Sequence, residues 1–191
     1  MKTTRLEAFS DGVLAIIITI MVLELKVPRG HDLAALRPLV PLFLSYLLSF
    51  VYVGIYWNNH HHLFHATREI SGSVMWANLV LLFFLSLIPV VTAWVGEHSQ
   101  APWPAALYGM VLFLAGSSYA ILERAIIAHE GARSELARAV GGGWKEKLSP
   151  LGYVAGIGLA FVRPWLADLV YAAVAAVWLV PDPRIEKRLR S

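Results

Sequence analysis

The chain has 191 residues, of which 58% are hydrophobic and only 15% are charged, with a formal net charge of +3. A soluble domain carries about 25% charged residues, so this composition indicates an integral membrane protein and leaves no room for a soluble catalytic domain. The sequence contains no cysteine, which excludes disulfides and thiolate chemistry. The basic residues lie in short segments between apolar stretches, where they act as topology signals, and we expect no binding of nucleic acid.

Hydrophobic stretches follow one another along the chain, each near the roughly 17–25 residues that a helix needs to cross a bilayer. They predict an all-α membrane protein with six transmembrane helices per subunit. The predicted helices cover residues 5–27, 36–58, 73–95, 105–140, 147–162 and 164–181, and the fourth continues past its apolar stretch as a cytoplasmic extension. Together they form a single transmembrane channel domain, residues 1–191.

Most of the 16 Lys and Arg residues fall on the side of the predicted bundle where the chain begins. Because cytoplasmic loops carry an excess of Lys and Arg, this bias places the N-terminus in the cytoplasm. An even number of spans then returns the C-terminus to the same side. The sequence therefore predicts a multi-pass protein with both termini in the cytoplasm.

The first helix places polar residues at the mouth of an apolar segment, which is costly in a bilayer unless those groups pair or face water. At ~100° per residue, Ile16, Thr19 and Leu23 lie within about 60° of one another. We call these three residues the Ile16 stripe. Ser10 and Asp11 point roughly 120–140° away from Ile16. The stripe is expected to line an axis shared with other copies, and Ser10 and Asp11 to face the subunit's own bundle.

A narrow ring of apolar side chains gates by dewetting, because an ion must shed water to cross it. Potassium holds its water less tightly than sodium, and a ring of Thr19 hydroxyls would replace part of that water. The sequence has no TVGYG-type carbonyl filter. A Leu/Ile stripe in a membrane helix is most often a packing or lipid-facing surface, so the residues alone leave that alternative open. For Asp11 the angle favours an ion pair within the bundle over a role in a pore.

Histidines cluster at the end of the second predicted helix, at positions 60, 61, 62 and 65. His61 and His65 share a helical face, as zinc ligands sometimes do, but no cysteine or carboxylate lies at the expected spacing. We therefore expect no bound metal and no other cofactor. Two alternatives to a channel remain open. One is a proton-coupled transporter that uses Asp11 and the histidines, and the other is a small membrane protein with histidine-bound metal or haem.

One pattern in the first helix combines an Arg, a Phe-Ser-Asp run and regularly spaced Ile, Thr and Leu. Its members are Arg5, Phe9, Ser10, Asp11, Ile16, Thr19 and Leu23. It closely resembles the signature of the endosomal/lysosomal potassium channel family in its short prokaryotic form. Later residues are also similar to that family, namely Trp57, His60, His61, Asn78 and Pro89.

The resemblance implies a homotetrameric, potassium-selective channel in which the first helices surround a central pore. The constriction would lie at Ile16, with further layers at Thr19 and Leu23. A structural polar network would brace the pore helix, formed by Arg5, Phe9, Ser10, Asp11, His60, His61 and Asn78. The expected partners are K⁺ ions, the lipid bilayer and further copies of the chain. The expected location is the inner (plasma) membrane of the cell, and no enzymatic activity is expected.

Overall fold

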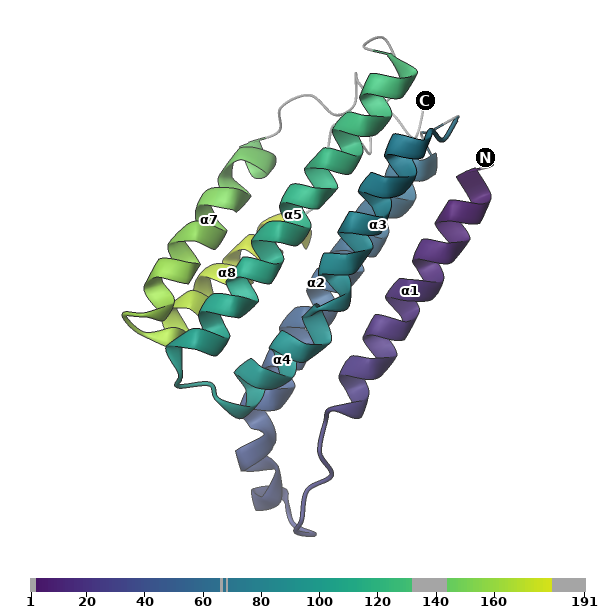
Figure 1. The fold of residues 1–191 in the computed structure, drawn as a ribbon. Helices are drawn as coiled ribbons and strands as arrows, with labels where there is room; N and C mark the ends of the chain where they lie inside the picture. Colours follow the sequence, from purple (N-terminus) through teal and green to yellow (C-terminus); the bar gives the residue numbers. More distant parts are fainter. Residues whose placement is uncertain (1–2, 66, 68, 132–143, 180–191) are drawn as a thin grey trace.

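The computed structural model describes residues 3–65, 67, 69–131 and 144–179, and every element in these residues is a helix. In chain order they are α1 (Thr3–Leu23), the 3₁₀ helix η1 (Leu33–Leu39), α2 (Val40–His65), α3 (Gly72–Ser86), α4 (Ile88–Glu97), α5 (Pro102–Glu130), α7 (Trp144–Ala160) and α8 (Pro164–Leu179). The helices run up and down along one elongated bundle, and α4 continues in the direction of α3 (Figure 1). The all-helical prediction is confirmed for the described part of the chain.

Four helical stretches are long and apolar enough to cross a membrane. They are α1, η1 together with α2, α3 together with α4, and α5. α8 is apolar but has only 16 residues, and α7 opens with the charged residues Lys145, Glu146 and Lys147. Each predicted span thus overlaps a helical stretch of the structure, and the first four satisfy the requirements for spanning a membrane by length and composition.

Several helix boundaries differ from those predicted. α1 ends at Leu23 and not at residue 27, and α2 continues to His65 and not only to residue 58. The third predicted span is divided at Leu87, where Pro89 in the first turn of α4 cannot donate a backbone hydrogen bond to the preceding turn. The fourth was expected to continue to residue 140, but α5 ends at Glu130 because Gly131 adopts a φ of 94°. Residues 132–140, and residues 180 and 181 of the last predicted helix, lie outside the described residues.

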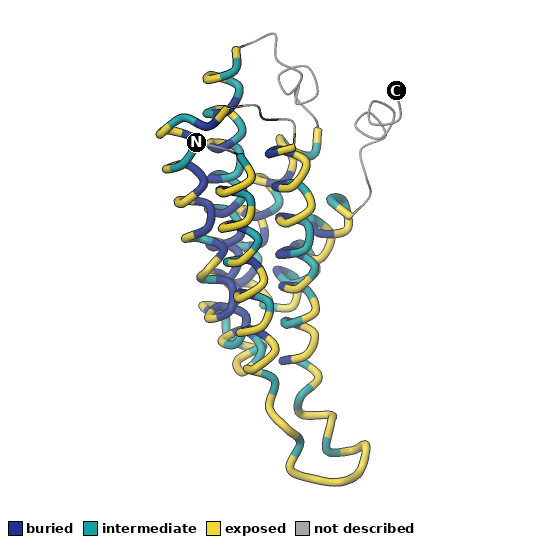
Figure 2. Tube along the Cα trace, turned by 90° about the vertical axis from the view of Figure 1, so that its right-hand side faces the viewer, coloured by how far each residue is buried: buried dark blue, intermediate teal, exposed yellow. Residues whose placement is uncertain are grey.

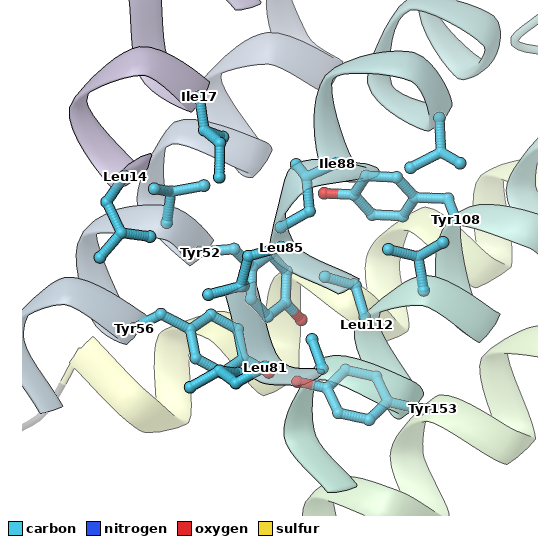
Figure 3. Packing of buried hydrophobic residues seen from close by; sticks show 14 of the residues in the cluster. Leu14, Ile17, Tyr52, Tyr56, Leu81, Leu85, Ile88, Tyr108, Leu112 and Tyr153 are labelled. Atoms are coloured by element: carbon cyan, nitrogen blue, oxygen red, sulfur yellow. The ribbon is translucent and has the colours of Figure 1, made fainter. Parts of the chain in front are cut away.

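The core lies where α2, α3, α4 and α5 face one another. Leu81, Leu85 and Ile88 pack there against Leu112 of α5, with Tyr52 and other tyrosines beside them (Figure 3). α1 lies at one edge of the bundle and contacts α2, α3 and α4 (Figure 1). Buried positions gather on the inner sides of the helices and exposed positions along their outer sides (Figure 2). One face of α1 therefore belongs to the subunit's core, and its other face does not.

Small residues let α8 approach α5 and α7 closely, as is common in membrane helix packing. Tyr171 of α8 is fully buried, and its hydroxyl donates a hydrogen bond to the backbone oxygen of Ala105 at 3.2 Å. A Cβ atom added at Gly109 would collide with that hydroxyl, and one at Gly156 would collide with the ring. Tyr52 of α2 donates to the backbone oxygen of Tyr171 at 2.7 Å. The last helix is therefore tied into the same bundle as the first half of the chain.

Candidate pore helix and its polar support

α1 has one face in the core and one face outside it. Its buried residues are Leu6, Ser10, Leu14, Ile17 and Met21, which recur at steps of three and four residues. Ile16 and Leu23 are 58% and 81% exposed, and Thr19 is also exposed. The Ile16 stripe therefore lies on a surface that the subunit's own helices leave uncovered.

The layers of the Ile16 stripe follow the helical rise. Ile16 and Thr19 are separated by about 4.5 Å along the helix axis, and Thr19 and Leu23 by about 6 Å. The Thr19 hydroxyl donates to the backbone oxygen of Ile16 at 2.9 Å. Its single hydrogen is thus used within the helix, and the remaining lone pairs of the oxygen are free to accept a hydrogen bond or contact a cation.

A directed chain of hydrogen bonds joins three helices behind the stripe. The Nε2 atom of His60 on α2 donates to Oδ1 of Asn78 on α3 at 2.8 Å, and Nδ2 of Asn78 donates to Oγ of Ser10 on α1 at 3.0 Å. The Ser10 hydroxyl donates in turn to the backbone oxygen of Leu6 at 2.9 Å. Ser10 and Asn78 are fully buried and His60 is 2% exposed. Each link has one donor and one acceptor, so the chain fixes how α1 is rotated against α2 and α3.

The orientation of the Asn78 amide decides the tautomer of His60. Because the amide nitrogen donates to Ser10, the amide oxygen must accept, and the hydrogen between the two side chains belongs to Nε2 of His60. The Nδ1 atom of His60 is then the bare acceptor nitrogen of a neutral ring. It is buried, and no hydrogen-bond partner for it lies within the described residues.

Two further contacts join α1 to α2 near the start of α1. The Trp57 indole Nε1 donates to Oδ1 of Asp11 at 3.1 Å, and Nδ1 of His61 donates to Oε1 of Glu7 at 2.9 Å. Both pairs are more exposed than the chain through Asn78. We call the Ser10–Asn78–His60 chain and these two pairs the polar support of α1.

The structure brings together only part of the predicted network. Ser10, His60 and Asn78 form one connected chain. Asp11 and His61 bind residues that the prediction did not include, and Arg5 and Phe9 are exposed with no hydrogen bond to another side chain among the residues described. Phe9 instead lies on the uncovered side of α1, where it is 53% exposed.

The sequence spacing does indicate the partners that the predicted network omitted, Trp57 for Asp11 and Glu7 for His61. Glu7 and Asp11 are one turn apart on α1, and Trp57 and His61 are one turn apart on α2. Two acceptors on one helix therefore match two donors on its antiparallel neighbour. In the described part of the chain, no group of three His, Cys, Asp or Glu side chains is placed to hold a metal ion.

Comparison with known proteins decides the family. Residues 5–89 match the family model described as "Endosomal/lysosomal potassium channel TMEM175". A protein named as a potassium channel from a Chryseobacterium species is 54% identical over 190 residues, which covers 100% of this chain and 99% of that protein. The chain belongs to the TMEM175 family. The resemblance found in the sequence is thereby confirmed.

Other members of the TMEM175 family agree with the fold. A crystal structure described as a lysosomal potassium-selective channel TMEM175 homolog, from Chamaesiphon minutus, matches with a TM-score of 0.78 and 29% identity, covering 93% of this chain and 96% of that one. The human protein named "Endosomal/lysosomal proton channel TMEM175" is 34% identical over 110 residues, which is 51% of this chain and 22% of that protein. The TMEM175 relatives are named as channels and not as enzymes, which confirms that part of the expectation.

Proposed function

We propose that the chain is one subunit of a homotetrameric, potassium-selective channel whose pore is lined by α1. The names of the Chryseobacterium relative and of the solved homolog support potassium as the permeant ion. The observation that supports α1 as the pore wall is the exposed Ile16 stripe, on the face opposite the polar support. Because the stripe occurs once per chain, a ring of it requires several subunits around one axis, with closed symmetry as the usual solution.

The proposed constriction is a ring of Ile16 side chains. Such a ring excludes water when it is narrow, so an ion that passes must give up part of its hydration shell. The Thr19 oxygens lie about 4.5 Å further along the axis and present free lone pairs. They would replace part of the water that the ion sheds. Leu23 adds a second apolar layer beyond them.

The polar support has a positioning role in this proposal. Rotation of α1 by one residue would turn the stripe by ~100° and replace Ile16 on the pore axis with a neighbouring side chain. The hydrogen-bonded chain from His60 through Asn78 to Ser10 opposes that rotation. The proposal also includes an inner-membrane location, cytoplasmic termini and no resident cofactor. The distribution of Lys and Arg along the sequence supports the cytoplasmic termini.

A flux assay with purified protein in liposomes tests the pore wall. Ile16→Asn is expected to raise K⁺ flux because a polar ring stays hydrated, and Thr19→Ala is expected to lower the preference for K⁺ over Na⁺. Leu47→Asn is a matched control, since Leu47 is an apolar residue of α2 that is 45% exposed. It should leave both quantities unchanged.

The outcomes separate the pore from a lipid-facing surface. If both substitutions in α1 leave flux and selectivity at the wild-type level, or if Leu47→Asn acts like Ile16→Asn, the assignment of α1 to the pore is wrong. Chemical cross-linking in detergent tests the assembly, with a ladder that ends at four subunits as the expected result.

The alternatives drawn from the sequence now have less support. Family membership favours a channel over a transporter or a histidine-based metal or haem protein. The donor chain from His60 ends on a backbone oxygen within α1 and does not reach the Ile16 stripe. Saturable uptake driven by a pH gradient, without K⁺ flux, would restore the transporter.

A further inference from the structure

His60 lies at the buried start of the hydrogen-bonded chain that reaches α1. Its side chain is 2% exposed, and its Nε2–H group donates to Asn78, whose amide donates to Ser10. The other ring nitrogen, Nδ1, is the buried side-chain atom without a hydrogen-bond partner in the part of the chain that the structure describes. Most buried polar atoms have a partner, so this nitrogen calls for a physical explanation.

The Nδ1 atom carries the lone pair of a neutral ring, so it can accept a proton at acid pH. Protonation leaves the bond from Nε2 to Asn78 possible, because both ring nitrogens of the cation are donors. The new Nδ1–H group, however, has no acceptor among the described residues. Phe64, whose ring centroid lies 4.5 Å from that of His60, offers no oxygen. The observed arrangement therefore fits the neutral ring and not the cation.

Two carboxylates of α1 lie near the level of His60. Trp57, three residues before it on α2, binds Asp11, and His61, the next residue, binds Glu7. α1 begins at the end of the bundle where α2 ends, so the two helices are antiparallel and His60 lies between the levels of these two pairs (Figure 1). Asp11, Glu7 and His61 also act on His60 electrostatically.

The same three helices carry few other side chains that are charged near neutral pH. On α1 the remaining one is Arg5, and on α2 they are His62 and His65, and all three are exposed. The sequence of α3 contains none. The acceptors that a protonated His60 could reach from these helices are therefore the two carboxylates of α1, and it can reach one only if α1 moves against α2.

We propose that Nδ1 of His60 is a proton-binding site that couples acid pH to the position of α1. The coupling rests on the proposed function, because the property that changes is K⁺ flux. In the neutral form, the chain through Asn78 and Ser10 holds the Ile16 stripe in its orientation. In the protonated form, the Nδ1–H group binds a carboxylate of α1, and α1 shifts to bring it there. The shift turns the Ile16 stripe away from the pore axis, so K⁺ flux falls.

K⁺ flux through purified protein in liposomes, with the same pH on both sides, tests the coupling. Flux is expected to be about tenfold lower at about pH 4.5 than at about pH 8, values on either side of the range in which imidazole usually titrates. Equal flux at the two pH values, or higher flux at the lower one, would overturn the proposal. Absence of K⁺ flux at both would overturn the proposed channel and the coupling with it, so the two failures are distinguishable.

His60→Gln removes the proton site and keeps a donor. The amide nitrogen of Gln is as many bonds from the backbone as Nε2 and is neutral at both pH values, so it can still donate to Asn78. The ratio of flux at the two pH values should fall to about one. His62→Gln is the matched control at an exposed position and should keep the tenfold ratio. A ratio unchanged in His60→Gln, or lost in His62→Gln, would contradict the assignment.

His61→Gln separates the buried site from the exposed pair of His61 with Glu7. This variant should also keep the tenfold ratio, because the proposed proton site is on the neighbouring ring. Loss of the ratio in His61→Gln together with its retention in His60→Gln would place the proton site at His61 and exclude His60.

Nitrogen-15 NMR follows the proton without a flux measurement. Six histidines can be replaced by Gln to leave His60 as the only one, namely His31, His61, His62, His65, His98 and His129. The remaining ring should show a bare Nδ1 and a protonated Nε2 at about pH 8, and two protonated nitrogens at about pH 4.5. A ring with one proton at both pH values, or with its proton on Nδ1 at the higher pH, would refute the site even where His60→Gln fails to assemble.

Discussion

Replacement of Asn78 by Leu is expected to loosen α1 from the rest of the subunit. Leu has the same number and branching of side-chain heavy atoms as Asn, so the change removes hydrogen bonds without leaving empty space. The amide of Asn78 is the middle link between His60 and Ser10, at 2.8 and 3.0 Å. Ser10 keeps its bond to the backbone oxygen of Leu6, whereas the Nε2–H group of His60 loses its acceptor.

The expected cost follows from these contacts. Hydrogen bonds between membrane helices contribute about 0.6 kcal/mol each on average. A buried donor left without an acceptor costs a further 1–3 kcal/mol or so. The Nδ1 atom of His60 already has no partner among the described residues, so the substitution would leave the ring without any hydrogen bond to those residues. Two such bonds are lost and one donor is orphaned, so we expect Asn78→Leu to lower the free energy of unfolding by about 2–4 kcal/mol.

Thermal or SDS unfolding of the purified protein measures this change. Ser118→Ala is the control, because Ser118 is 3% exposed and, among the residues that the structure describes, its hydroxyl bonds only to the backbone oxygen of Leu114 in its own helix. Ser10→Ala combined with Asn78→Leu should cost less than the sum of the two single changes, since both act on one link. The reasoning is refuted if Asn78→Leu costs no more than Ser118→Ala, or if the two changes are additive.

Two other substitutions probe contacts away from that chain. Gly156→Ala should destabilise the protein by about 1–3 kcal/mol in the same unfolding assay, because the added Cβ meets the Tyr171 ring. The control Gly158→Ala should have no effect, because an added Cβ there meets no atom within 4 Å. Equal stability of the two variants would contradict the packing of α8 against α7. Trp57→Phe removes the indole donor to Asp11 at an exposed site, so we expect the free energy of unfolding to fall by about 1 kcal/mol or less. A decrease as large as that of Gly156→Ala would contradict this expectation.

The sequence was sufficient to predict which way the first helix faces. A step of ~100° per residue separates Ser10 from Ile16 by about 120°. In the structure Ser10 is fully buried and Ile16 is 58% exposed. This result follows from helix geometry alone, because no tertiary contact is needed to compute an angle between two residues on one helix. The pore role of that face stays a prediction.

The partners of Asp11 and His61 could not be predicted in the same way. An angle gives the direction of a side chain, but its partner depends on the register between α1 and α2. That register is set by the segment between them, where the Asp32 side chain accepts a hydrogen bond from the backbone of Ala35 and begins the 3₁₀ helix η1. A pattern of apolar residues contains no information on how far such a connection shifts one helix along another.

Polar residues, more than apolar ones, determine which face of α1 turns outward. In a bilayer the lipid tails are about as apolar as Leu or Ile, so hydrophobic burial gives little preference between packing a side chain on the subunit and exposing it. A side-chain amide such as that of Asn78 must find partners on neighbouring helices, since no water is available to it, whereas a Ser or Thr hydroxyl can also donate to a backbone oxygen of its own helix. Ser10 therefore faces Asn78, and Ile16 is placed about 120° away as a consequence. If Ser10 stood on the opposite face, the same hydrogen bond would turn the Ile16 stripe into the subunit, and no set of apolar contacts would oppose it.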